Sequence, residues 1–343
     1  MKSLREYSMN LPEEEYHNYP AWSYSLIAKY AKDGFGAISR LHEKTPPTPS
    51  MEFGSLFDSV LTRGKATLNE YAISDYTPSD SVKRVMDTLL VNTSVPFDEI
   101  PKEEIENATI ACSFYPKWGF DAKYKQIAEA RAYYEARREG KKVVAVKDWE
   151  DAIEMARIFR EDPYLSTLFG THSSRKLEYI YQAQFLAKMW TPAGKLVEIK
   201  IMPDLLVVNH EAKTIQPVDL KTSSMPAFDF AENFIKFRYD IQASLYTDVL
   251  EVIKNQIDDY VDYTILEYIF TDISRTDKVP ASYNYDPRSE SQINGLSFGN
   301  YQYKNWKTLL DEILYYEETA AKVPSYIRTD GPNDLLELLN KRK

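Results

Sequence analysis

Two runs of apolar, β-branched residues with a polar turn between them constrain the middle of this chain more than any other feature. The first run covers residues 196–208 and the second residues 214–221. The first run alternates apolar with polar residues and then becomes continuously apolar, which is typical of a strand that enters a buried layer. Residues 209–213 are polar and short enough to connect a hairpin. The sequence therefore predicts an antiparallel pair of strands at the centre of the fold.

Charged residues lie where these two strands should meet. Asp204 follows Pro203 near the end of the first strand, and Asp219 and Lys221 lie near the end of the second. Side chains alternate across a strand, so Asp219 and Lys221 share one face while Leu220 points to the other. We therefore expect two carboxylates and one ammonium group to converge at one edge of the sheet.

This arrangement suits metal-assisted chemistry on a phosphate. Asp204, Asp219 and the backbone carbonyl of Leu220 would form an oxygen site for Mg²⁺, with Mn²⁺ able to substitute for it. Such a metal polarises a phosphoryl oxygen and lowers the pKa of a bound water. Lys221 beside two carboxylates should stay protonated, so we expect it to orient the water or to offset developing charge. The alternative is a surface Asp-x-Lys ion pair after a Pro-Asp turn, both of which are common.

A helix is predicted over residues 231–253, after the second strand. Gln242 and Tyr246 are four residues apart and Tyr239 is three before Gln242, so the three share one face. The opposite, apolar face would pack on the sheet. The basic residues near its start are candidate phosphate contacts: Lys236 and Arg238.

The remaining elements follow from helical or strand periodicity and from turn residues. Residues 1–20 are expected to be irregular, and Ser50 is the expected N-cap of the second helix. The predicted helices cover residues 22–32, 50–61, 82–90, 123–139, 149–160 and 302–322, and further strands cover 260–271 and 279–285. Residues 123–139 combine Lys, Arg and Tyr, which indicates either a nucleic-acid contact or a solvated helix face.

The order Pro-Asp, fourteen residues, Asp-Leu-Lys-Thr and then Tyr-x-x-Gln-x-x-x-Tyr resembles the PD-(D/E)XK nuclease superfamily. More narrowly, it is similar to the exonuclease VIII (RecE) type of phage and prophage recombination systems, related to lambda exonuclease and RecB-type nucleases. The resemblance implies a restriction-endonuclease-like α/β core, with a central mixed β-sheet flanked by helices, over residues 170–343. Residues 1–169 would form a mostly helical region that contributes to the site. The resemblance implies catalytic roles for Asp204, Asp219, Lys221, Gln242 and Tyr246, and substrate contacts by Tyr239, Lys236, Arg238 and Thr222.

Two acidic residues upstream extend the resemblance. The segment Gly54–Asp58 is similar to the family's Gly-x-x-x-His helix, whose His binds metal, with Asp58 in place of that His. Aspartate also binds hard cations, so Asp58 is either a metal ligand or a solvated residue on a core-packing helix. Residues 177–189 are predicted as a strand, with a helix as the alternative. Glu178 at their start is the candidate for the acidic residue that such nucleases place early in the core, although an isolated Glu is usually a surface charge.

Composition limits the function classes. The 343 residues include 42 basic and 52 acidic ones, for a net charge of −10, which argues against a nonspecific nucleic-acid coat protein. A local basic channel can still bind phosphates in an acidic protein. One cysteine excludes an intrachain disulfide, and the four histidines lack zinc-site spacing. No apolar run reaches the roughly 18 residues that span a bilayer, and no signal-peptide core is present. We therefore expect no membrane partner and a cytoplasmic location, in the host if the chain is phage-encoded.

Residues and resemblance together predict a Mg²⁺-dependent DNA exonuclease that degrades duplex ends and exposes a single strand for an annealing protein. The DNA end, the annealing partner and a homo-oligomeric state come from the resemblance alone. Two alternatives remain open. One is a structure- or sequence-selective DNA endonuclease that uses the same site. The other is a catalytically silent module that binds a DNA end or a protein, in which Asp58 marks a decayed site.

Overall fold

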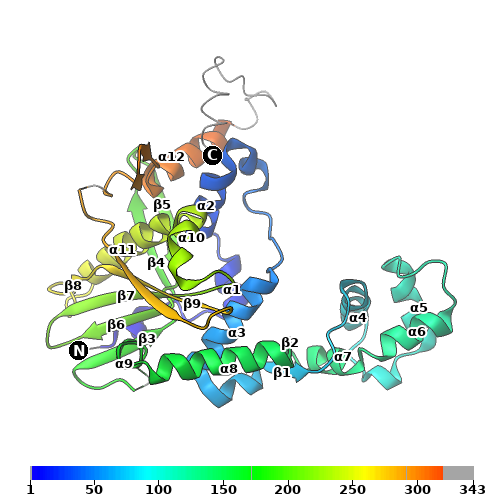
Figure 1. Cartoon of the computed structure of the whole chain (residues 1–343). Helices are drawn as coiled ribbons and strands as arrows, with labels where there is room; N and C mark the ends of the chain where they lie inside the picture. The colour runs from blue at the N-terminus through cyan, green and yellow to red at the C-terminus, as the bar shows by residue number, and fades with distance from the viewer. Residues whose placement is uncertain (1, 171, 291, 320–343) are drawn as a thin grey trace.

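A mixed β-sheet organises the fold (Figure 1). The computed structural model describes residues 2–170, 172–290 and 292–319. In these ranges the sheet has the strand order β10-β9-β7-β6-β3, and β8 also pairs with β7. The strands are β3 (Leu177–Tyr181), β6 (Leu205–Asn209), β7 (Thr214–Ser223), β8 (Thr264–Ile265), β9 (Tyr268–Ser274) and β10 (Pro280–Tyr285). β7 is parallel to β8 and β9, whereas the other neighbours are antiparallel. The prediction of an α/β fold with a mixed sheet is confirmed.

The predicted hairpin is present, but its first strand is broken. β6 and β7 pair from Leu205 opposite Val218 to Asn209 opposite Thr214. The predicted strand over residues 196–208 consists of β5 (Leu196–Ile201) and β6, interrupted at Pro203, which has no N–H to donate to a ladder. β5 pairs with β4 (Phe185–Trp190) in a separate two-stranded sheet. Asp204 therefore precedes β6 and does not end a strand.

Residues 177–189 form two strands, β3 and β4, so the helical alternative for them is wrong. Gln182, in the break between them, has a positive φ of 49°. Gln182 N donates a hydrogen bond to Asp204 O. β3 pairs with β6 and β4 pairs with β5, so the breaks at Gln182 and at Pro203 lie opposite each other. Asp204 lies at this break.

A proline in β7 splits the strand that pairs with it. The sequence predicted one strand over residues 260–271, whereas the structure has β8 and β9 with two residues between them. Leu266 N donates to Ile215 O, so the backbone of Pro217, two residues along β7, faces the same side. Pro217 has no N–H to donate there, and the ladder resumes at Val218. The predicted partner strand over residues 279–285 is confirmed as β10, antiparallel to β9.

Helices cover both faces of the sheet (Figure 1). On one face, α2 (Tyr24–Asp33), α11 (Tyr239–Asn255) and α12 (Trp306–Thr319) share a core with β4, β5 and part of the main sheet. On the other face, α3 (Pro49–Arg63), α8 (Val146–Glu161) and α9 (Pro163–Leu168) pack against Leu205, Val218 and Ile269. The predicted last helix is α12, and the part of that prediction beyond residue 319 lies outside the described residues.

A helical arm extends away from the sheet (Figure 1). It consists of α4 (Asp80–Asn92), η4 (Phe97–Glu99), α5 (Lys102–Ala111), α6 (Phe120–Ala128) and α7 (Arg131–Arg138), and it has a core of its own. The parallel pair β1 (Tyr71–Ser74) and β2 (Lys142–Ala145), which the sequence did not predict, lies at its base. The predicted single helix over residues 123–139 is wrong, because the chain forms two helices there. Tyr133 and Tyr134 are buried in the arm's core, so they are not available to stack on bases.

The N-terminal segment contains two short helices, whereas the sequence predicted an irregular segment. It contains η1 (Leu4–Tyr7) and α1 (Glu13–Asn18). Lys200 Nζ, from β5, donates hydrogen bonds to the carbonyl oxygens of Tyr16, His17 and Tyr19. A cation that binds the last carbonyls of a helix is favourable, and here it fastens α1 to the sheet.

Two helix boundaries differ from the prediction for local reasons. α3 begins two residues earlier than expected, because Thr48 Oγ1 accepts a hydrogen bond from Met51 N and Pro49 occupies the first helical position, which prolines favour. The N-cap is therefore Thr48 and not Ser50. The predicted helix over residues 231–253 is divided into α10 (Phe230–Phe237) and α11 by Arg238, whose φ of 57° is left-handed.

The other short elements are η2 (Gly34–Arg40), η3 (Gly64–Asn69), η5 (Ala227–Asp229), β11 (Ser297–Phe298) and β12 (Tyr301–Gln302). Of the helices in the part of the chain that the structure describes, none combines the length and the apolar character needed to cross a membrane.

Candidate active site

Asp219, Lys221 and Gln242 form a closed polar triangle between β7 and α11. Asp219 is 1% exposed, and its Oδ2 lies 2.6 Å from Lys221 Nζ. Gln242 Nε2 donates a hydrogen bond to Asp219 Oδ1, and Gln242 Oε1 accepts one from Lys221 Nζ at 3.2 Å. The strand period brings Asp219 and Lys221 to one face, and the first turns of α11 bring Gln242 over them. The Lys221 side chain is 21% exposed, so solvent reaches one end of this triangle.

Asp204, the residue that precedes β6, lies next to the triangle. Its Oδ2 accepts a hydrogen bond from Leu220 N at 2.8 Å. The register that pairs Leu205 with Val218 sets Asp204 level with Asp219, in the middle of β7. The structure therefore brings Asp204, Asp219 and Lys221 together at one edge of the sheet, as the hairpin pattern predicted.

Asp58 reaches this edge from α3. The Gln182 side-chain amide donates a hydrogen bond to Asp58 Oδ2, while Gln182 N donates to Asp204 O, so Gln182 links the two aspartates. A Cβ on Gly54 would lie 3.4 Å from Thr222 Oγ1, which shows how closely α3 approaches β7. Thr222 is therefore placed at the contact between α3 and β7.

The carboxylates of this site repel one another. Burial, together with Glu13 and Asp219, raises the pKa of Asp58 to about 7, although Arg63 opposes the shift. Burial and the charge of Asp219 raise the pKa of Asp204 well above its usual value, and Lys221 opposes this only in part. Three carboxyl groups lie near one lysine, so in the absence of a cation Asp58 and Asp204 tend to hold their protons, and a bound cation would favour their ionised forms.

Lys221 remains a cation in this environment. Burial lowers its pKa, but the nearby Asp219, Tyr239 and Asp204 raise it by more, so the net shift is upward. The expectation of a protonated lysine agrees with this direction. The lysine can supply charge or orient a ligand, whereas it would be a poor base at neutral pH.

The donor set fits a hard divalent cation in its chemistry. The carboxylates of Asp58, Asp204 and Asp219 and the carbonyl of Leu220 offer oxygen ligands, which Mg²⁺ and Mn²⁺ prefer. Crowded carboxylates with raised pKa values form an environment that a cation stabilises. As the side chains are placed in residues 2–170, 172–290 and 292–319, no three His, Cys, Asp or Glu residues are close enough to hold a metal ion. Asp219 would have to release Gln242 or Lys221 to become a ligand.

The predicted tyrosines have different environments. Lys221 Nζ lies 4.6 Å from the centre of the Tyr239 ring, so Tyr239 borders the site. Tyr246 is buried against Tyr268, and burial raises its pKa well above the usual value. Tyr246 therefore packs beneath the site, and the placement gives it no exposed contact with a substrate.

Two of the other predicted residues lie apart from the polar triangle. Lys236 is exposed near the end of α10, with its Nζ 5.2 Å from the centre of the Phe237 ring. Glu178 is paired with Val208, toward the opposite end of β6 from Asp204. Glu178 accepts a hydrogen bond from Ser3 Oγ and lies 3.4 Å from His210 Nε2, so the structure does not bring it to the site.

Arg238 has a structural position that the sequence did not suggest. The residue is 6% exposed, and its guanidinium makes a bidentate pair with Asp240 at 2.9 and 3.0 Å and donates to Lys304 O at 2.7 Å. Its donors are therefore engaged inside the protein, and the placement gives no support to the predicted phosphate contact. The pair instead sets the angle between α10 and α11.

We expect Arg238→Ala to reduce the free energy of unfolding by about 3–5 kcal/mol, because it leaves the buried Asp240 carboxylate without its partner. Urea unfolding monitored by circular dichroism would measure the change. Arg157→Ala, which removes an exposed ion pair with Glu161, is the matched control and should cost no more than about 0.5 kcal/mol. Equal effects of the two substitutions would contradict the structural role of Arg238.

Sequence reasoning missed two polar residues close to this site. Gln182 joins Asp58 to Asp204, and nothing in its sequence context marks it. Asp272 lies on β9 in register with Lys221, accepts a hydrogen bond from Ser223 Oγ, and has an Oδ1 without a hydrogen-bond partner among the described residues. The signal for Asp272 was available, because it is a single charge within the apolar run at residues 268–273.

Asp272 should make the stability of the fold depend on pH. Burial raises its pKa from the ordinary 3.8 to about 6, against the opposing hydrogen bond from Ser223. A carboxyl whose pKa is higher in the folded state favours folding at low pH, and this contribution is lost as the pH rises through about 6. We expect Asp272→Asn to exceed the wild type in free energy of unfolding by about 1–3 kcal/mol at pH 8, and the difference to shrink toward pH 4.5.

Urea unfolding at the two pH values, in EDTA, would test this, with the exposed Asp262→Asn as a control that should change little. A difference between Asp272→Asn and the wild type that is the same at both pH values would contradict the prediction.

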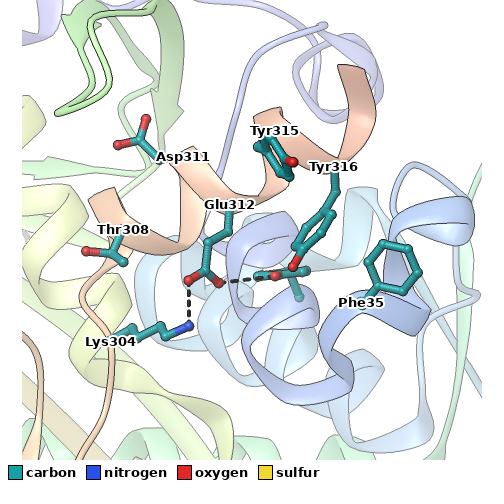
Figure 2. A pocket seen from close by; sticks show the side chains of 8 residues that line it. Phe35, Lys304, Thr308, Asp311, Glu312, Tyr315 and Tyr316 are labelled. Carbon is teal, nitrogen blue, oxygen red and sulfur yellow. Dashed lines mark hydrogen bonds and ion pairs between the residues drawn. The ribbon is translucent and has the colours of Figure 1, made fainter. Parts of the chain in front are cut away.

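A separate pocket of about 490 Å³ lies beside α12 (Figure 2). Figure 2 shows the Lys304 side chain directed toward Glu312, with which it forms an ion pair. The Tyr30 hydroxyl donates a hydrogen bond to Glu312 at 3.1 Å. The lining residues come from α2, η2, α12 and the segment before α12, and they are different from those of the predicted site.

Comparison with known proteins identified no relative whose site could be compared with this one. No protein-family model matches this chain, and no curated protein sequence matches it at a significant level.

Proposed function

We propose that this protein is a Mg²⁺-dependent deoxyribonuclease with a PD-(D/E)XK core. The observation that carries the proposal is the meeting of Asp204, Asp219 and a protonated Lys221 under Gln242 at one edge of the sheet. The sequence order Pro-Asp, Asp-x-Lys and Gln-x-x-x-Tyr was the pattern that resembled this superfamily. Convergence of its polar members in space supports the interpretation over that of a chance surface ion pair.

Asp204, Asp219 and the Leu220 carbonyl, with Asp58, are the residues that would hold the cation. When bound, Mg²⁺ would polarise the scissile phosphate and lower the pKa of an attacking water. Leu220 N holds the Asp204 carboxylate in place, and Gln182 holds Asp58. Gln242 orients the Lys221 ammonium, which would offset charge that develops on the phosphate or direct the water.

We further propose action on DNA ends, with release of a single strand that an annealing protein would receive. This part rests on the resemblance to the exonuclease VIII type, as do a homo-oligomeric assembly and the annealing partner. The overall charge of −10 means that DNA must meet a local rather than a global basic surface.

The test is to incubate purified protein with linear and with covalently closed circular duplex DNA, in Mg²⁺ or in EDTA. An exonuclease degrades the linear DNA only, and EDTA stops it. Cleavage of the circle would replace the exonuclease with an endonuclease at the same site. Absence of metal-dependent cleavage of either DNA would contradict the proposal and favour a silent module that binds a DNA end or a protein.

A further inference from the structure

We propose that Phe237 and Lys236 form a subsite that stacks an unpaired nucleobase within about three nucleotides of the scissile phosphate. The inference rests on the proposed function, because it places the subsite relative to Lys221. The sequence predicted Lys236 as a phosphate contact, but it predicted no base-stacking role for Phe237. The ligand is a nucleobase of any sequence at a single-stranded or frayed DNA end.

An unbroken series of contacts connects Lys221 to this surface. Lys221 Nζ lies 4.6 Å from the centre of the Tyr239 ring, and the Tyr239 ring is stacked on Phe237 with centroids 5.7 Å apart and planes inclined by 26°. Phe237 is 42% exposed, and Lys236 Nζ lies over its ring, 5.2 Å from the ring centre, so a base that stacks on Phe237 takes the place of this ammonium group. An aromatic ring with solvent on part of its surface therefore continues a stack that begins at the catalytic lysine.

The backbone around Phe237 is held in place, although the residue ends a helix. The Tyr24 hydroxyl donates a hydrogen bond to Phe237 O at 2.7 Å. The next residue, Arg238, is in the left-handed region and fastened by Asp240 and Lys304 O. Single exposed apolar residues are common on protein surfaces. This one differs because its position is fixed from both sides and its ring is stacked on a residue of the site.

The chemistry of the pair matches a nucleotide. A free aromatic surface stacks on any base, since every base has a π face, and an adjacent lysine contacts the phosphate. The two steps of 4.6 and 5.7 Å place Phe237 at most about three nucleotides from Lys221, at a stacked rise of about 3.4 Å each. Interior base pairs of a duplex offer no free face, so the subsite selects an end or an unpaired strand. Such a preference needs no sequence readout, as expected for progressive degradation.

The experiment measures binding without cleavage. DNA with a single-stranded end carries 2-aminopurine at one of the first three positions from the 5′ or the 3′ end, or at an interior duplex position, and is titrated with the full-length protein in EDTA. We expect quenching of the fluorophore near one end, loss of most of that quenching in Phe237→Ala, and its recovery in Phe237→Trp. Stacking of one base predicts about 5- to 150-fold weaker binding by Phe237→Ala.

Trp190→Ala is the matched control, because Trp190 is 68% exposed and lines a pocket with Val252, more than three turns along α11 from Tyr239. It should bind as the wild type does. Lys236→Ala should weaken binding at all sequences and reduce the salt dependence by about one phosphate contact. Thermal unfolding of each variant confirms that it is folded.

The outcomes separate the subsite from the nuclease. Unchanged quenching in Phe237→Ala, or an equal loss in Trp190→Ala, overturns the subsite even if the protein cleaves DNA. Aromatic-dependent quenching by a protein that shows no metal-dependent cleavage supports the subsite and contradicts the proposed nuclease.

Discussion

Lys221→Met is expected to reduce metal-dependent DNA cleavage by about 10²- to 10³-fold, the loss that follows removal of one group that stabilises transition-state charge. Methionine keeps most of the aliphatic stem and removes the cation that Asp219 and Gln242 hold. Because Lys221 is a protonated, positioned charge, its loss should act mainly on kcat and only weakly on substrate affinity. Initial rates over a range of DNA concentrations would separate the two parameters.

Lys188→Met is the control for this substitution, since Lys188 is largely exposed and pairs with Glu198 on the β4–β5 ribbon, away from Lys221. It should leave both parameters unchanged. Lys221→Arg keeps the charge and should retain more activity than Lys221→Met. Full activity in Lys221→Met would show that the ion pair with Asp219 is structural and would remove the main support for the proposed mechanism.

The hairpin and its carboxylates could be predicted because local rules decide them. A period of two sets which face Asp219 and Lys221 share, and a short polar connection sets the register that brings Asp204 beside them. The helical period likewise predicted that Gln242 and Tyr239 would share a face, and both now border Lys221. These relations depend on spacing within about forty residues, which the sequence displays directly.

The other members of the site depend on long-range packing. Gln182 is itself a left-handed residue between two strands, and this backbone conformation accompanies its contact with Asp58. No pattern in the sequence identifies such a position. Asp272 comes beside Lys221 through a parallel crossover whose register no turn determines. Arg238 was predicted as a phosphate ligand because a basic residue near the start of a helix usually faces solvent. Its burial depends on Asp240 and on the carbonyl of Lys304, which is sixty-six residues away.

Asp219→Asn should have the largest effect of any single substitution. Asparagine has nearly the same shape, but it removes one of the charges that a divalent cation would need. It also replaces one carboxylate oxygen with an NH2 group, which cannot accept a hydrogen bond, so Gln242 and Lys221 no longer each have an acceptor oxygen of their own. We expect cleavage to fall by at least about 10³-fold, since both metal binding and the orientation of Lys221 depend on this carboxylate.

Thermal unfolding with and without Mg²⁺ gives a second readout that does not need activity. A cation that binds the folded state stabilises it in proportion to the logarithm of its concentration above the dissociation constant. The melting temperature of the wild type should therefore rise with added Mg²⁺, and that of Asp219→Asn should not. Asp262→Asn, an exposed aspartate that pairs with Lys213, should respond as the wild type does. An equal Mg²⁺ response in Asp219→Asn would mean that the cation binds elsewhere. The polar triangle would then be a structural network that fastens α11 to β7, and a residual nuclease activity would have to be assigned to another part of the fold.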